Sequence, residues 1–328
     1  MERTPVSFGP GVFLIYGGYM DKPFKTYDEQ IHILADRGVE IETTKQKSNA
    51  KKLLQREGYY NLINGYSKLF LEDVNMYKTG TTMEEIFALY KFDIKLREIF
   101  LKNILHLETN IKSLIAYYFP KSHPEPNYLI YENFNTSKRN ASSHITSLFA
   151  EIQKQIASHA TDPSISHYLT NYGYLPIWVL NNILTMGTIS KFYSLMIQSE
   201  RQEISKIFHL SDNELESILF YVSKIRNFCA HGNRLYCYRC KTPLSNFEIH
   251  SQINIPNGED IEYTYGKRDL FACVIGLKYT LSKSEFKKFI EAIDTALKNL
   301  KSRISVISIA EVLLSMGFPS DWKQKILN

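Results

Sequence analysis

Apolar residues recur at helical spacing over most of this 328-residue chain. The longest such pattern covers Thr82–Tyr118 and predicts one long amphipathic helix. Its apolar stripe consists of Ile86, Leu89, Leu96, Phe100, Ile104, Leu107, Ile111 and Leu114.

A second strong pattern begins at Ser211. Ser211 and Glu214 have the spacing of a capping box, in which the serine accepts from a backbone N–H and the glutamate reaches back. The predicted helix runs to Tyr236, with Leu215, Ile218, Val222, Ile225 and Cys229 as its core stripe. We expect this helix and the long one to pack antiparallel at the centre of a helical bundle.

The rest of the chain predicts shorter helices and one region with the residue pattern of β-strands. Helical spacing recurs at Thr26–Arg37, Thr44–Arg56, Ala141–His159, Trp178–Leu184, Thr188–Met196, Glu285–Arg303, Val306–Ser315 and Asp321–Leu327, and Pro120–Asn140 reads as a loop. Asn246–Ile255, Asp260–Tyr265 and Phe271–Tyr279 are β-branched or aromatic runs between turn residues. The predicted fold class is therefore mainly α, with a small antiparallel β element near residues 246–279.

Composition narrows the function classes only slightly. Apolar residues make up 44% of the chain, which excludes a disordered protein, and a net charge of +5 favours an anionic partner only weakly. No apolar run approaches the length of a membrane span, and we expect no membrane association. Residues 1–20 lack the basic start of a signal peptide and read as a loose leader or edge segment. Four cysteines without such a signal indicate a reducing, cytoplasmic setting.

Cys237 and Cys240 form half of a zinc-site pattern. Cys229, His231, His250 or Cys273 would have to complete it, because no second Cys-x2-Cys pair follows. Two reduced thiols are the favoured interpretation, with a structural zinc as the alternative. We predict no metal and no cofactor.

The candidate chemistry lies at the end of the second helix. Asn227 and His231 fall about 160° from the middle of the core stripe, and Arg226 lies on its flank. An imidazole takes or gives a proton near neutrality, and a guanidinium opposes the charge that develops on a phosphorane. These groups suit attack by a ribose 2′-OH on its own phosphate, which restricts the substrate to RNA. On spacing alone, a solvated helix face is the favoured interpretation, because an arginine five residues before a histidine occurs by chance in many chains.

The amino-acid sequence of the motif also resembles that of a known family. The sequence RNFCAHGNRLY (residues 226–236) resembles the RN-x-x-AH-x-x-RL-[WY] signature of HEPN-domain proteins in the Abi family of abortive-infection proteins, AbiD/AbiF type. Five further blocks are similar to those of that family, in the same order: Lys22–Ile41, Gly58–Tyr66, Phe92–Lys112, Leu175–Tyr193 and Met316–Trp322.

The resemblance implies a single Abi/HEPN-like domain over residues 1–328. It divides into an N-terminal helical part (1–80), a HEPN-like core (81–240) and a C-terminal part (241–328). It also implies a metal-independent endoribonuclease in antiphage or toxin–antitoxin defence, with Arg226, His231 and Asn227 as catalytic residues. Such proteins often place an acidic residue opposite the motif, and Glu108 suits that position; Asp93 instead pairs with Arg97 one helical turn away. Gly232 stands where the family often has a second histidine.

RNA is the expected substrate, and a regulatory non-coding RNA is a possible second partner. Because one motif supplies one imidazole, the resemblance also implies a homodimer with both copies of His231 in a shared cleft. Candidate RNA-binding residues are Lys45, Lys51, Lys52, Arg56, Lys138, Arg139 and Arg234. Two alternatives remain open: a non-catalytic RNA-binding protein and a purely structural helical protein.

Overall fold

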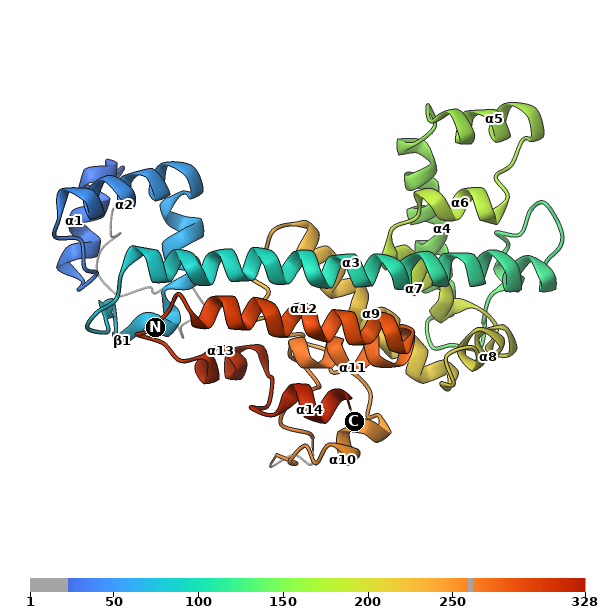
Figure 1. The fold of residues 1–328 in the computed structure, drawn as a ribbon. Coiled ribbons are helices and arrows are strands. Elements are labelled where there is room, and N and C mark those ends of the chain that lie inside the picture. The colour runs from blue at the N-terminus through green and yellow to red at the C-terminus, as the bar shows by residue number, and fades with distance from the viewer. Residues whose placement is uncertain (1–22, 259–261, 328) are drawn as a thin grey trace, which may run out of the picture.

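The structure is a computed structural model that describes residues 23–258 and 262–327. The proposed leader over residues 1–20 lies outside this part of the chain. The described residues form a mainly α fold, which confirms the predicted fold class (Figure 1). The α-helices are α1 Tyr27–Asp36, α2 Thr44–Glu57, α3 Met83–Ser122, α4 Ala141–Ser158, α5 Pro163–Tyr172, α6 Ile177–Ile183, α7 Met186–Leu195, α8 Gln198–Lys206, α9 Asp212–Ala230, α10 Glu248–Gln252, α11 Leu270–Thr280, α12 Lys283–Lys301, α13 Ile309–Met316 and α14 Trp322–Leu327.

Helix α3 is the axis on which the other elements assemble. Its 40 residues span roughly 60 Å, and α12 lies along it (Figure 1). Helices α1 and α2 lie near its N-terminal end, while α6 and α8 pack near its C-terminal end (Figure 1). Seven of the eight predicted stripe residues of α3 are buried, and Leu114 is half-buried. The apolar stripe therefore faces the core, as its spacing predicts.

Helices α3 and α9 pack antiparallel, as expected. Glu108 of α3 lies beside Arg226 of α9, and Asp93, earlier on α3, contacts Tyr236, which follows α9. The contacts therefore run in opposite directions along the two segments. The capping box of Ser211 and Glu214 is formed, and all five predicted core residues of α9 are buried.

Helix α9 ends at Ala230, six residues before the predicted end. Gly232 adopts φ +69°, the N–H of Gly232 donates to the carbonyl of Cys229, and the N–H of Asn233 donates to that of Phe228. This is a Schellman motif, in which a glycine in the left-handed region closes the helix. A glycine at position 232 is therefore explained by the helix end that it closes. His231 is the C-cap residue of α9 and does not lie in the interior of the helix.

The predicted β element near residues 246–279 is wrong. Its described part contains α10, α11 and only an isolated bridge between Asn257 and Tyr263. Nine of the eleven residues of α11 are buried, so the helix has no broad polar face to reveal its period. A short helix buried on all sides has the same apolar pattern as a buried strand. The two-stranded sheet that the structure does contain pairs Leu71–Asp73 (β1) with Met76–Tyr77 (β2), and the sequence did not predict it.

Smaller differences concern irregular helices. Tyr60–Asn64 forms a π-helix, and neither this segment nor α8 was predicted as a helix. Helix α3 continues through Pro120 to Ser122 and so includes the first three residues of the expected loop. Short 3-10 turns occur at Lys68–Phe70 and Tyr131–Asn133. No helix in residues 23–258 and 262–327 is long and apolar enough to cross a membrane.

Candidate active site

A buried carboxylate holds the motif arginine. Glu108 Oε2 lies 3.5 Å from Arg226 Nε, and Glu108 Oε1 lies 2.9 Å from Lys112 Nζ. The Glu108 side chain is 8% exposed, whereas that of Arg226 is 28% exposed. The terminal nitrogens of Arg226 form no hydrogen bond to any described residue. The pair is an ion pair without a hydrogen bond, because neither Glu108 Oε2 nor Arg226 Nε has a hydrogen-bond partner among the described residues. The terminal edge of the guanidinium is available to bind an anion.

His231 opens onto a cavity of about 450 Å³. One side of this cavity comes from the end of α9 and the loop after it, through His231, Gly232, Asn233 and Arg234. The segment 60–66 also lines it, and α3 contributes Tyr90 and Arg97. The cavity therefore combines one imidazole, two guanidinium groups and several aromatic rings, which suits a phosphate and an adjoining base.

Two tyrosines of this cavity, Tyr66 and Tyr90, remain protonated at neutral pH. Burial, with a hydrogen bond to Glu57, raises the pKa of Tyr90 to about 12. Burial and the nearby Asp93 raise the pKa of Tyr66 well above its ordinary value. Among the side-chain types that line the cavity, imidazole is the one that exchanges protons near neutrality. His231 is therefore the candidate acid or base.

Asp93 fixes the loop that carries the second half of the motif. Its buried carboxylate accepts from Tyr66 Oη at 2.7 Å, from the backbone N–H of Leu235 at 3.2 Å and from that of Tyr236 at 2.7 Å. It also forms an ion pair with Arg97 at 2.5 Å. The spacing of Asp93 and Arg97 predicts only a local helical pair, whereas in the structure they link the segment 58–66, α3 and the motif.

Asn227 does not share the cavity of His231. It lines a separate cavity of about 650 Å³ between α7 and α9, although it lies only one helical turn from His231. Arg226 lines neither of these two cavities. The structure thus places Glu108 with Arg226, and it separates His231 from Asn227.

Four of the predicted RNA-binding residues lie on α2. Lys45 and Lys52 are exposed. Lys51 forms an ion pair with Asp28 at 2.8 Å, and Arg56 pairs with Glu57 at 2.6 Å while its guanidinium stacks over Phe87. None of the four lines the cavity of His231. They lie on a different element, where Lys51 and Arg56 are already paired with carboxylates.

The other three predicted RNA-binding residues have different environments. Lys138 is occupied by Glu216 and by the carbonyl of Ser194, and it borders the cavity of Asn227. Arg139 is exposed. Arg234 lines the cavity of His231, where its Nη1 donates to the carbonyls of Asn64 and Gly65. Of the three, only Arg234 lies beside His231.

A comparison with protein-family models matches residues 52–237 to a family described as Abi-like protein. The match covers more than half of the chain. The chain belongs to the Abi-like protein family. No curated protein and no solved structure matches it. In this Abi-like protein the matched region contains the segment 58–66, all of α3 and α9, and the motif up to Cys237.

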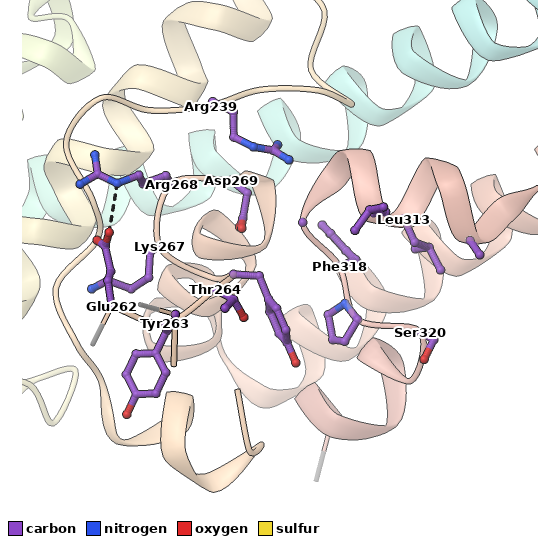
Figure 2. A pocket seen from close by; sticks show the side chains of 16 residues that line it. Arg239, Glu262, Tyr263, Thr264, Lys267, Arg268, Asp269, Leu313, Phe318 and Ser320 are labelled. Atoms are coloured by element: carbon purple, nitrogen blue, oxygen red, sulfur yellow. Dashed lines mark hydrogen bonds and ion pairs between the residues drawn. The ribbon is translucent and has the colours of Figure 1, made fainter. Parts of the chain in front are cut away.

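The part of this Abi-like protein beyond the family match encloses a cavity of about 800 Å³ (Figure 2). Its charged groups are largely satisfied internally: Arg268 pairs with Glu262 at 3.3 Å, and Arg239 donates to the carbonyl of Ser315. Asp269 caps α11, and burial raises its pKa to about 6. This cavity contains no residue of the motif, so we do not assign it to the active site.

The four cysteines are free thiols. Burial raises the pKa of Cys229 to about 12 and raises that of Cys237 above its ordinary value. The described residues contain no group of three or more His, Cys, Asp or Glu side chains that could hold a metal ion. Among these residues, Cys237 and Cys240 therefore lack further ligands of these types.

Proposed function

We propose that this Abi-like protein is an endoribonuclease of the HEPN type that acts in abortive-infection or toxin-like defence, and that it cleaves RNA by attack of the 2′-OH. The observation that carries the proposal is an exposed His231 in a basic cavity, five residues after an accessible Arg226 that lies 3.5 Å from the buried Glu108. These are the two kinds of group that the reaction requires.

The proposed reaction is a phosphoryl transfer within one RNA strand, from the 5′-oxygen to the neighbouring 2′-oxygen. His231 removes the proton of the 2′-OH, the 2′-oxygen bonds to the neighbouring phosphorus, and the bond to the 5′-oxygen breaks. Arg226 opposes the negative charge that builds up on the phosphorane. The 5′-oxygen leaves with a proton, and the products are a 2′,3′-cyclic phosphate and a 5′-hydroxyl. This sequence of steps needs no metal ion.

A homodimer would supply the second proton-transfer group. The cavity of one protomer offers one imidazole, so we propose that His231 of the partner subunit protonates the leaving 5′-oxygen. A two-fold contact is also the commonest arrangement of homo-oligomers.

A non-catalytic RNA-binding protein is the second candidate. The separation of His231 and Asn227 into two cavities favours it, because a binding surface does not require the motif residues to converge on one atom. The basic residues of α2 and the aromatic rings of the segment 60–66 would serve binding equally well.

The deciding experiment incubates purified protein with single-stranded RNA, or with DNA of the same sequence, in EDTA. Wild type is expected to cut only the RNA and to leave 2′,3′-cyclic phosphate ends. The variants His231→Ala and Arg226→Ala are each expected to lose about 10²–10⁴-fold in rate, and Asn227→Ala less. Activity that EDTA abolishes and magnesium restores would contradict the proposed mechanism.

The same variants distinguish catalysis from structure. His231 is exposed, so His231→Ala is expected to change the free energy of unfolding by less than about 0.5 kcal/mol. RNA binding without cleavage by the wild type would support the second candidate.

A further inference from the structure

We propose that the cavity between α7 and α9 binds a phosphodiester segment of the RNA strand next to the cleavage position. The proposal rests on the endoribonuclease function and adds a substrate-binding subsite to it. Asn227 lines this cavity one helical turn, or about 6 Å, before His231. A strand whose phosphate lies at His231 therefore reaches the cavity as it continues along the end of α9.

The cavity has an excess of positive charge. Lys138, Lys191 and Lys224 line it, and Glu216 is its one acidic lining residue. The charge of Glu216 is opposed by Lys138 at 3.0 Å and by the buried Arg201, which also pairs with Asp212. Lys191 and Lys224 form no ion pair with any described residue, so they are the cations available to a ligand.

These two lysines are placed differently. Lys191 Nζ donates to Ser147 Oγ at 2.8 Å, and burial lowers its pKa, so it has lost hydration that an anion can replace. Lys224 Nζ lies 4.8 Å from the centroid of the Phe220 ring. The ring itself lines the cavity and offers an aromatic surface on which a base can stack.

The remaining lining groups also suit phosphate. Hydroxyl groups surround the cavity, from Ser190, Ser194, Ser217, Ser223, Thr242 and Ser245. Helix α7 begins at Met186, and Gly187 in its first turn borders the cavity. The first turn of a helix presents free backbone N–H groups and a positive dipole end, both of which favour an anion. Cations, hydroxyls and an aromatic ring together fit a nucleic-acid strand better than an apolar ligand.

The test measures binding separately from cleavage. The double variant Lys191→Ala/Lys224→Ala is compared with Lys287→Ala/Lys288→Ala, which removes the same charge from exposed positions of α12 outside the cavity. Lys138 is left unchanged because it holds Glu216 and Ser194 in place. Fluorescence anisotropy gives the Kd of a labelled single-stranded 2′-O-methyl RNA, which cannot be cut by 2′-OH attack. Thermal unfolding verifies that both variants fold.

The cavity variant is expected to bind about tenfold more weakly or worse, and the salt dependence of its log K to fall by about 1.4, or about 0.7 for each lost phosphate contact. The control variant is expected to bind like the wild type. Equal losses in both variants, or no loss in the cavity variant, would overturn the proposal. Competition by 5′-AMP as strong as that of the RNA would overturn it in favour of a free-nucleotide site.

These outcomes are independent of the cleavage assay. If His231→Ala abolishes cleavage and the cavity variant still binds normally, the endoribonuclease stands and the subsite fails. If the cavity variant loses binding and the wild type does not cleave, the cavity stands as an RNA-binding site, and the catalytic proposal fails together with the position of the cavity beside a cleavage site.

Discussion

At the scale of single residues, the candidate site is organised by two buried carboxylates on α3. Asp93 holds the backbone of Leu235 and Tyr236, and so shapes the loop that forms one side of the His231 cavity. Glu108 instead touches a side chain, Arg226, and shares its charge with Lys112. One carboxylate therefore supports the site through the backbone, and the other orients a group proposed to contact the substrate.

The role of Glu108 predicts a specific kinetic effect. Glu108→Gln removes the charge that orients Arg226, so kcat for RNA cleavage is expected to fall about tenfold, equivalent to about 1.4 kcal/mol of transition-state stabilisation. The Kd for 2′-O-methyl RNA is expected to stay the same. Single-turnover cleavage and anisotropy measure the two quantities.

The matched control for this variant is Glu98→Gln. Glu98 lies on the same helix, where it is exposed and paired with Lys95 at 2.9 Å. The Glu98→Gln variant is expected to cut RNA at the rate of the wild type. If both variants keep full activity, Glu108 has no orienting role.

At the scale of elements, helix ends decide where functional and structural residues lie. Gly232 closes α9 and leaves His231 at its C-cap, exposed beside the cavity. Gly173 and Gly317 cap α5 and α13 in the same left-handed conformation, each with φ +75°. The surroundings of the last two differ: a Cβ on Gly173 would meet nothing within 4 Å, whereas one on Gly317 would lie 2.2 Å from Cγ of Asp269.

This contrast predicts two sizes of destabilisation. Gly173→Ala pays only for the left-handed backbone, and is expected to lower the free energy of unfolding by about 1–2 kcal/mol. Gly317→Ala also forces Asp269 away from α11, which is expected to add about 1–3 kcal/mol. Urea denaturation of both variants measures the difference. Equal losses in the free energy of unfolding would show that Asp269 can move away from residue 317 without destabilising the protein.

At the scale of the whole molecule, α3 connects parts of the chain that are distant in sequence. The segment 58–66 lies near its N-terminal half, α9 packs across it, and α12 follows it from the C-terminal part (Figure 1). The cavity of His231 forms where the segment 58–66 and the loop after α9 meet beside α3, and Arg234 also joins the first two directly through the carbonyls of Asn64 and Gly65. A single chain supplies one His231 to that cavity. We propose a dimer because the reaction benefits from a second imidazole.

The proposed dimer predicts that assembly and activity change together. Analytical ultracentrifugation at the enzyme concentration used for cleavage is expected to show a dimer, and specific activity is expected to fall on dilution below the dissociation constant. Cleavage at full rate by a strictly monomeric protein would exclude a catalytic contribution from the partner subunit.

The sequence by itself determined the two central helices and the position of the motif. Helices α3 and α9 were predictable because each has one apolar stripe against polar residues, and because Ser211 and Glu214 mark a start that local geometry enforces. The same spacing, with the family resemblance, pointed to Glu108 opposite the motif, and Glu108 lies 3.5 Å from Arg226.

Only the tertiary structure decided how these parts meet. Helix α11 was mistaken for a strand because burial on every side removes the polar face that reveals a helical period. Tyr66, Asp93 and Arg97 could not be assigned to the site because their partners Leu235 and Tyr236 lie 142 and 143 positions from Asp93. Local periodicity describes how a segment faces the core. Which distant segments share a cavity depends on packing across the whole chain, and no local pattern encodes it.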